Sequence, residues 1–150
     1  MTEQPLFKSG WEVAGIRDGE KFFRSLHQLL PTPAYLVLEG TSIARDVRAL
    51  LQTAAVPPRR HIPVGTIFPR PTTYHIPASE SFLLALADLA AKHAEAEVCD
   101  HLHAYDDSRG LLQWYDAFDL SMLVEDSIPE DGIRELCDVL GATYRRWQAG

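Results

Sequence analysis

Prolines are concentrated in one stretch of this 150-residue chain, and that stretch constrains the fold more than any other feature. Six of the ten prolines lie between Pro57 and Pro77. Proline lacks a backbone N–H donor and restricts the residue before it, so a proline-dense segment suits neither a helix nor a central strand. We therefore expect an extended loop over residues 55–78, with a short edge strand conceivable only at 64–68. A loop of this length in a compact domain is usually functional or mobile.

The sequence before the loop alternates between strand-like and helical patterns. Apolar residues at helical spacing predict a helix over residues 20–30, which Pro31 ends. Residues 11–16 have strand-like composition, and the short apolar run at 34–38 predicts a buried strand. A second helical stripe follows over residues 43–54, and Thr41 or Ser42 is placed to cap that helix. A strand, a glycine-containing turn and a capped helix indicate a β-α unit.

The sequence after the loop predicts two helices and an antiparallel meander. Ser79 is placed to cap a helix that runs to about residue 90. Residues 98–105 and 111–118 form a hairpin pattern around the turn at 106–110, and residues 121–124 are a candidate third strand. Ser127 and Glu130 have capping-box spacing for a last helix that Gly141 ends. Residues 142–148 fit either a strand or a helix.

These elements predict a single α+β domain over residues 1–150. We expect a mixed β-sheet with a C-terminal antiparallel hairpin or meander, packed by about four helices. No apolar run reaches the ~18 residues of a membrane-spanning helix, and the N-terminus lacks the pattern of a signal peptide. We therefore expect a cytoplasmic protein, in which Cys99 and Cys137 stay reduced.

The net charge of −7 conceals two regions of opposite sign. Residues 1–75 contain nine Lys and Arg against six Asp and Glu, whereas residues 76–150 contain five against fifteen. Acidity is strongest over residues 95–138, with thirteen acidic and two basic residues. This balance argues against a dedicated nucleic-acid binder and against a membrane surface as partner, and it suits a basic protein partner.

Strand alternation divides the hairpin into an apolar face and a polar, aromatic face. Leu102, Ala104, Leu112 and Trp114 share the apolar side, against which helices should pack. The reverse side carries His101, His103, Tyr105 and Tyr115. Polar and aromatic side chains of this kind are typical of interfaces, so we expect this face to be exposed and to bind a partner or a second copy in a homodimer.

The two histidines of this face also suggest a metal site. His101 and His103 are two residues apart on a strand, so both imidazoles can approach one divalent ion. Asp106, Asp107 or His75 are candidates to complete the ligand set. With a carboxylate nearby, the site would suit a small metal-dependent hydrolase.

A third candidate site is an anion-binding turn. Thr41 and Ser42 follow Gly40 at an expected helix start, where backbone N–H groups and the helix dipole favour an anion. No phosphate-binding glycine motif accompanies them. The proline-rich loop is a separate candidate site, at which Arg70 and His75 are among the side chains that could bind a ligand or partner; the alternative is a passive segment that covers the sheet.

The function that these patterns favour is a small non-enzymatic binding domain, of an inhibitor, immunity or adaptor type. The metal-dependent hydrolase is the alternative, so whether the chain is an enzyme stays open. The sequence identifies no particular cofactor.

Overall fold

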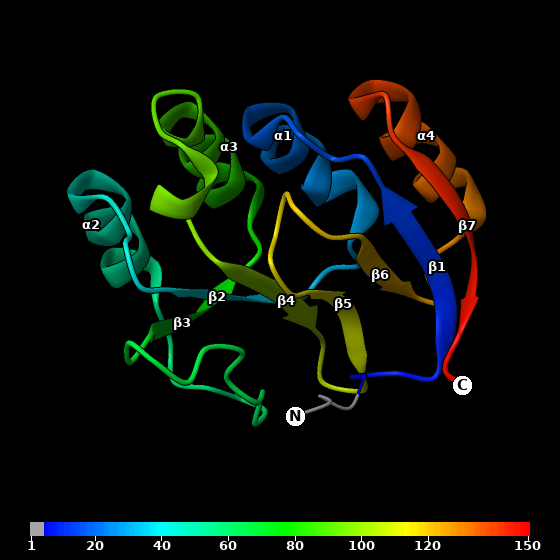
Figure 1. Cartoon of the computed structure of the whole chain (residues 1–150), viewed down its shortest axis with the longest axis horizontal. Coiled ribbons are helices and arrows are strands. Elements are labelled where there is room, and N and C mark those ends of the chain that lie inside the picture. The colour runs from blue at the N-terminus through cyan, green and yellow to red at the C-terminus, as the bar shows by residue number, and fades with distance from the viewer. Residues whose placement is uncertain (1–4) are drawn as a thin grey trace.

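A computed structural model describes residues 5–150 as one β-sheet with four α-helices on one of its faces (Figure 1). The strands are β1 (Ser9–Ala14), β2 (Tyr35–Gly40), β3 (Thr72–Pro77), β4 (His101–Tyr105), β5 (Gly110–Trp114), β6 (Met122–Glu125) and β7 (Thr143–Gln148). The helices are α1 (Gly19–Leu29), α2 (Arg45–Ala54), α3 (Glu80–Ala90) and α4 (Glu130–Leu140), with a short 3₁₀ turn at Glu95–Glu97.

The predicted α+β class is confirmed, but the sheet is not mixed. Its order is β3-β2-β4-β5-β6-β1-β7, and every neighbouring pair is antiparallel. The helical crossovers explain the difference. Helix α3 joins β3 to β4, which run in the same direction but lie on either side of β2. Helix α4 likewise joins β6 to β7 around β1, so parallel strands never become neighbours.

The helix-covered face of the sheet forms the apolar core. Leu102, Leu112 and Trp114 are fully buried on this face, as the strand alternation predicts. Phe22 of α1 packs its ring 5.0 Å from that of Trp114, measured between centroids. Removal of such apolar surface from water is the main stabilising contribution to a fold of this kind.

Several local expectations were wrong at the ends of elements. The expected loop at 55–78 contains β3, and residues 64–68 form no strand. Helix α2 begins after Ala44, so neither Thr41 nor Ser42 caps it. Helix α4 begins after Pro129 rather than from a Ser127 capping box. Ser79 caps α3, and Gly141 ends α4 at a φ of 66°, both as expected.

The face of the sheet opposite the helices is also covered. The proline-rich segment, residues 57–71, crosses this face beneath β2 and β4, and residues 5–8 pass beneath β5 (Figure 1). The Leu6 backbone N–H donates to Gln113 Oε1 at 2.7 Å. Gly110 makes room for this chain, because a Cβ at 110 would lie 2.9 Å from Leu6 Cβ. The expectation that the His/Tyr face is exposed is therefore wrong.

Within residues 5–150, no helix combines the length and the apolar character needed to cross a membrane.

Candidate functional site

The polar side chains expected on the hairpin do lie together, but they are buried. His101 and His103 point to the same side of β4, and both rings contact Tyr115 edge-on, with centroids 5.4 and 4.7 Å away. His75 comes from β3, and its Nδ1 lies 2.8 Å from the hydroxyl of Tyr105. We call these five residues the covered polar face. His103 is only 1% exposed and Tyr105 is fully buried, so neither side chain lies at the surface, whereas Tyr115 is half-buried.

A buried carboxylate holds the proline-rich segment on this face. Glu39 of β2 is 2% exposed, and its side chain accepts hydrogen bonds from the backbone N–H groups of Gly65 and Thr66, at 2.9 and 2.8 Å. Thr66 Oγ1 lies 2.9 Å from His101 Nε2. Gly65 is required at this approach, because a Cβ there would lie 2.7 Å from the His101 ring.

The two histidines of β4, His101 and His103, carry their ring proton on Nε2 when neutral. The backbone N–H of Asp116 donates to His101 Nδ1 at 2.9 Å, and that of Trp114 donates to His103 Nδ1 at 3.2 Å. An imidazole nitrogen that accepts a hydrogen bond is unprotonated, so the ring proton of each neutral histidine lies on Nε2. His101 therefore donates from Nε2 toward Thr66, and it cannot act as the base that activates the Thr66 hydroxyl.

Burial keeps His103 and His75 neutral. Desolvation, with a smaller contribution from His101, lowers the pKa of His103 to about 3. Desolvation also lowers the pKa of His75. His103 Nε2 has no hydrogen-bond partner among the described residues, which adds to the cost of its burial.

The ligand set of a metal-dependent hydrolase is not assembled on the covered polar face. Within residues 5–150, no group of three or more His, Cys, Asp or Glu side chains is arranged to hold a metal ion. The carboxylate nearest His101 is Glu39, with Oε2 3.8 Å from Nε2. Asp107 instead pairs with Arg59 at 2.9 Å, and His75 bonds Tyr105.

The cysteines are equally unsuited to nucleophilic chemistry. Cys99 and Cys137 are free and buried. Burial raises the pKa of Cys99 to about 12 and that of Cys137 to about 11. Both therefore remain thiols at neutral pH, whereas a reactive cysteine needs a thiolate.

A polar cavity of about 420 Å³ opens beside His101. Its walls include Arg17 and the carboxylates of Glu95, Asp100, Asp116 and Asp119. Since both nitrogens of His101 are engaged, this ring contributes no general base to the cavity.

The expected anion-binding turn already contains an anion of the protein itself. The Thr41 N–H and hydroxyl both donate to Asp100 Oδ2 at 3.0 Å, and Ser42 is exposed beside it. Arg70 is exposed in the proline-rich segment, whereas His75 is buried on the covered polar face. The Asp100 carboxylate therefore satisfies the Thr41 donors that a ligand would use.

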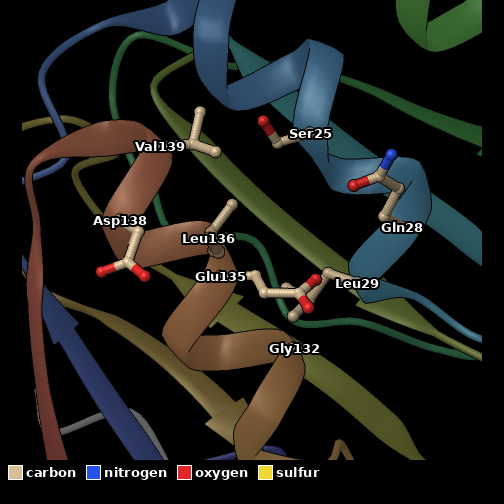
Figure 2. Close-up of a pocket in the computed structure, with 8 residues that line it drawn as sticks. All are labelled: Ser25, Gln28, Leu29, Gly132, Glu135, Leu136, Asp138 and Val139. Atoms are coloured by element: carbon tan, nitrogen blue, oxygen red, sulfur yellow. The ribbon is translucent and has the colours of Figure 1, made fainter.

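The helix layer contains an apolar groove that the sequence patterns did not reveal. It lies between α1 and α4, has a volume of about 320 Å³, and includes Gly132 in its lining (Figure 2). Leu136 and Val139 point from α4 toward α1, and Val139 is 53% exposed. Leu29 of α1 lies beside Gly132 of α4. The remaining lining residues are polar: Ser25, Gln28, Glu135 and Asp138. We call this feature the α1–α4 groove.

The rim of the α1–α4 groove is acidic. Glu135 and Asp138 are exposed, and neither has an ion-pair partner among the described residues. Glu135 points toward α1 across the groove, whereas the Asp138 carboxylate points away from α1 (Figure 2). By contrast, the neighbouring Glu130 and Asp131 both pair with Arg134. The groove therefore combines an apolar floor with one carboxylate, that of Glu135, which has no ion-pair partner among the described residues.

Sequence reasoning missed Glu39, Gly65, Thr66 and the residues of this groove. Glu39 had a usable signal, because alternation along β2 places it opposite the apolar Leu36 and Leu38. Gly65 and Thr66 had none, since their role depends on how a proline-rich loop folds back over the sheet.

Comparison of the chain with protein-family models, with curated protein sequences and with solved structures gives no match.

Proposed function

We propose that this chain is a non-enzymatic binding domain, of an inhibitor, immunity or adaptor type, that docks a basic protein partner on its helix layer. The observation that supports this most is the α1–α4 groove, with its apolar floor and the Glu135 carboxylate, which has no ion-pair partner among the described residues. An apolar side chain flanked by Lys or Arg fits both properties, because burial supplies affinity and opposite charge supplies orientation and encounter rate.

Three further features support a binding role in the cytoplasm. The acidic stretch at 95–138 includes most of α4, so a basic partner is attracted from a distance and nucleic-acid phosphates are repelled. The covered polar face lacks a free base and a set of three metal ligands among the described residues, so no observation favours the hydrolase. Free buried cysteines suit a reducing compartment.

The proposal is tested by fluorescence polarisation with a labelled peptide that has one Phe flanked by three lysines on each side. Binding is expected, and a peptide with Gly in place of Phe should bind at least about tenfold more weakly. The variant G132L fills the groove without a change of charge. It should therefore bind the Phe peptide and the Gly peptide with the same low affinity. Equal binding of both peptides, or unchanged binding by G132L, would overturn the proposal.

G132A is the matched control for that variant. A Cβ at 132 would lie 3.6 Å from Leu29 Cδ1, an ordinary contact, so alanine fits without displacing a neighbour. Alanine also favours a helix over glycine, so this variant should bind normally and unfold at a slightly higher temperature.

A further inference from the structure

The proline-rich segment has an apolar tip that the fold leaves in solvent. Ile67 and Phe68 are 85% and 89% exposed, although they are adjacent and large. Isolated apolar side chains on a surface are ordinary, but two neighbouring ones at the end of a loop are typical of a contact site.

The tip is nevertheless held in place by its neighbours. Thr66, directly before the tip, is fixed by its backbone N–H on Glu39 and by its hydroxyl on His101. Pro69 follows the tip directly and restricts the backbone on that side. A contact element that is ordered before binding loses less conformational entropy when it binds, so affinity improves.

The surroundings of the tip are basic. Residues 57–71 contain three arginines, Arg59, Arg60 and Arg70, and no acidic residue. Arg59 is paired with Asp107, whereas Arg70 lies two residues from Phe68 and is exposed. The tip is therefore an apolar pair with positive charge at its side, which is complementary to the apolar floor of the α1–α4 groove and to the Glu135 carboxylate beside it.

The tip and the groove of one molecule lie too far apart in the fold to meet. The proline-rich segment lies on the covered polar face beneath the β3-β2-β4 end of the sheet, whereas α4 lies on the other face, near β7 at the opposite end (Figure 1). Any contact between them must join two molecules. Such a contact pairs different surfaces, so it repeats into rings or open chains.

We propose that the partner of the α1–α4 groove is the Ile67–Phe68 tip of a second copy of this chain, so that the protein associates head to tail. This inference rests on the proposed function, because it names the occupant of the same groove. One loop tip in one groove buries a small area, so the association is expected to be weak and concentration-dependent.

Sedimentation velocity of the full chain, up to about 1 mM, tests the proposal. The sedimentation coefficient of the wild type should rise with concentration, and the rise should shrink in high salt because screening weakens the charge contribution. I67S/F68S removes the tip and G132L fills the groove, so each variant alone should remain monomeric. Both changes lie at exposed or groove positions, and thermal unfolding of each variant checks that the fold is kept.

The decisive sample is an equimolar mixture of the two variants. I67S/F68S retains a groove and G132L retains a tip, so the mixture should form a one-to-one complex that cannot extend further. A monomeric wild type at all concentrations, or a mixture that stays monomeric while the wild type associates, would overturn the head-to-tail contact. Cosedimentation of a monomeric wild type with phosphatidylserine vesicles would instead assign the tip to a membrane and would also overturn it.

The lysine-flanked Phe peptide separates this inference from the proposed function. If the wild type binds that peptide in the groove but does not self-associate, the second copy is the wrong partner and the binding function stands. If the wild type neither self-associates nor binds the peptide, both the head-to-tail contact and the proposed binding function are overturned.

Discussion

The two faces of this sheet are built from alternate residues of the same strands, yet they are held by different interactions. On the helix-covered face, apolar residues such as Leu102 and Trp114 pack against α1 in one continuous core. On the covered polar face, His101 and Glu39 are buried beneath the proline-rich segment, which a few hydrogen bonds hold in place. Apolar packing against the helix layer therefore supplies most of the stability of the fold, whereas the proline-rich segment only covers the polar face.

This difference implies that the two covers have different stability. Apolar burial is summed over many contacts, so the helix layer should open only when the whole domain unfolds. A loop held by a few hydrogen bonds can open locally at a much smaller free energy. Four substitutions or conditions test this comparison.

Replacement of a large side chain on the helix-covered face should have the greatest effect. Trp114→Ala leaves a cavity beside Phe22 and Phe118, whose rings lie 5.0 Å or less from that of Trp114. The free energy of unfolding should fall by about 3–5 kcal/mol, as measured by urea denaturation. A loss under about 1 kcal/mol would mean that the helix layer is not the main source of stability.

Removal of the carboxylate that holds the proline-rich segment should have a smaller and local effect. Glu39→Ala leaves the N–H groups of Gly65 and Thr66 without their acceptor, which should lower the stability by about 1–3 kcal/mol. Hydrogen exchange should accelerate over residues 57–71 and remain slow in α1 and α4. Glu39→Gln keeps an acceptor oxygen and is the matched control, and uniform acceleration across the chain would contradict the comparison.

Acid should lower the free energy of unfolding, because His103 on the covered polar face is held in its neutral form. The folded pKa is about 3, against 6.5 for an unperturbed histidine, so between these values the unfolded chain binds a proton that the folded chain does not. Stability should therefore fall as the pH drops from about 6.5 toward 3, by up to about 1.4 kcal/mol per pH unit. His103→Gln removes this contribution, so urea titrations at several pH values should give it a shallower slope. Parallel slopes would contradict the assignment.

The apolar tip should matter least to stability. Phe68 is almost fully exposed, so Phe68→Ala should change the free energy of unfolding by less than about 0.5 kcal/mol. The same variant should reduce self-association if the tip docks in a second copy. A marked loss of stability would show that the tip packs on its own molecule.

Sequence patterns were reliable where a single periodicity decides the structure. Helical spacing located α1 and α3, and strand alternation separated Leu102 from His101 correctly. Sequence patterns were unreliable where a contact with a distant part of the chain determines the secondary structure. The strand β7 exists because it pairs with β1, whose residues are 129 to 139 positions away in the chain, and its own sequence fits a helix or a strand.

The candidate site shows the same division. Alternation places His101, His103, Tyr105 and Tyr115 on one face, but it contains no information on what covers that face. Only the folded chain brings Gly65 onto Glu39, and only helix packing places Leu29 of α1 beside Gly132 of α4. Both contacts join segments that are distant in the sequence.

The central claim is that the covered polar face is shielded from solvent and ligands, so that partners bind on the helix layer. Nitrogen-15 NMR of the imidazoles tests this claim most directly. At neutral pH, His101 and His103 should both carry the proton on Nε2, and His103 should stay neutral until the pH approaches 3. Added zinc should leave both signals unchanged. Titration of His103 near pH 6.5, a proton on Nδ1, or a zinc-dependent shift would show that this face is open to solvent and ligands.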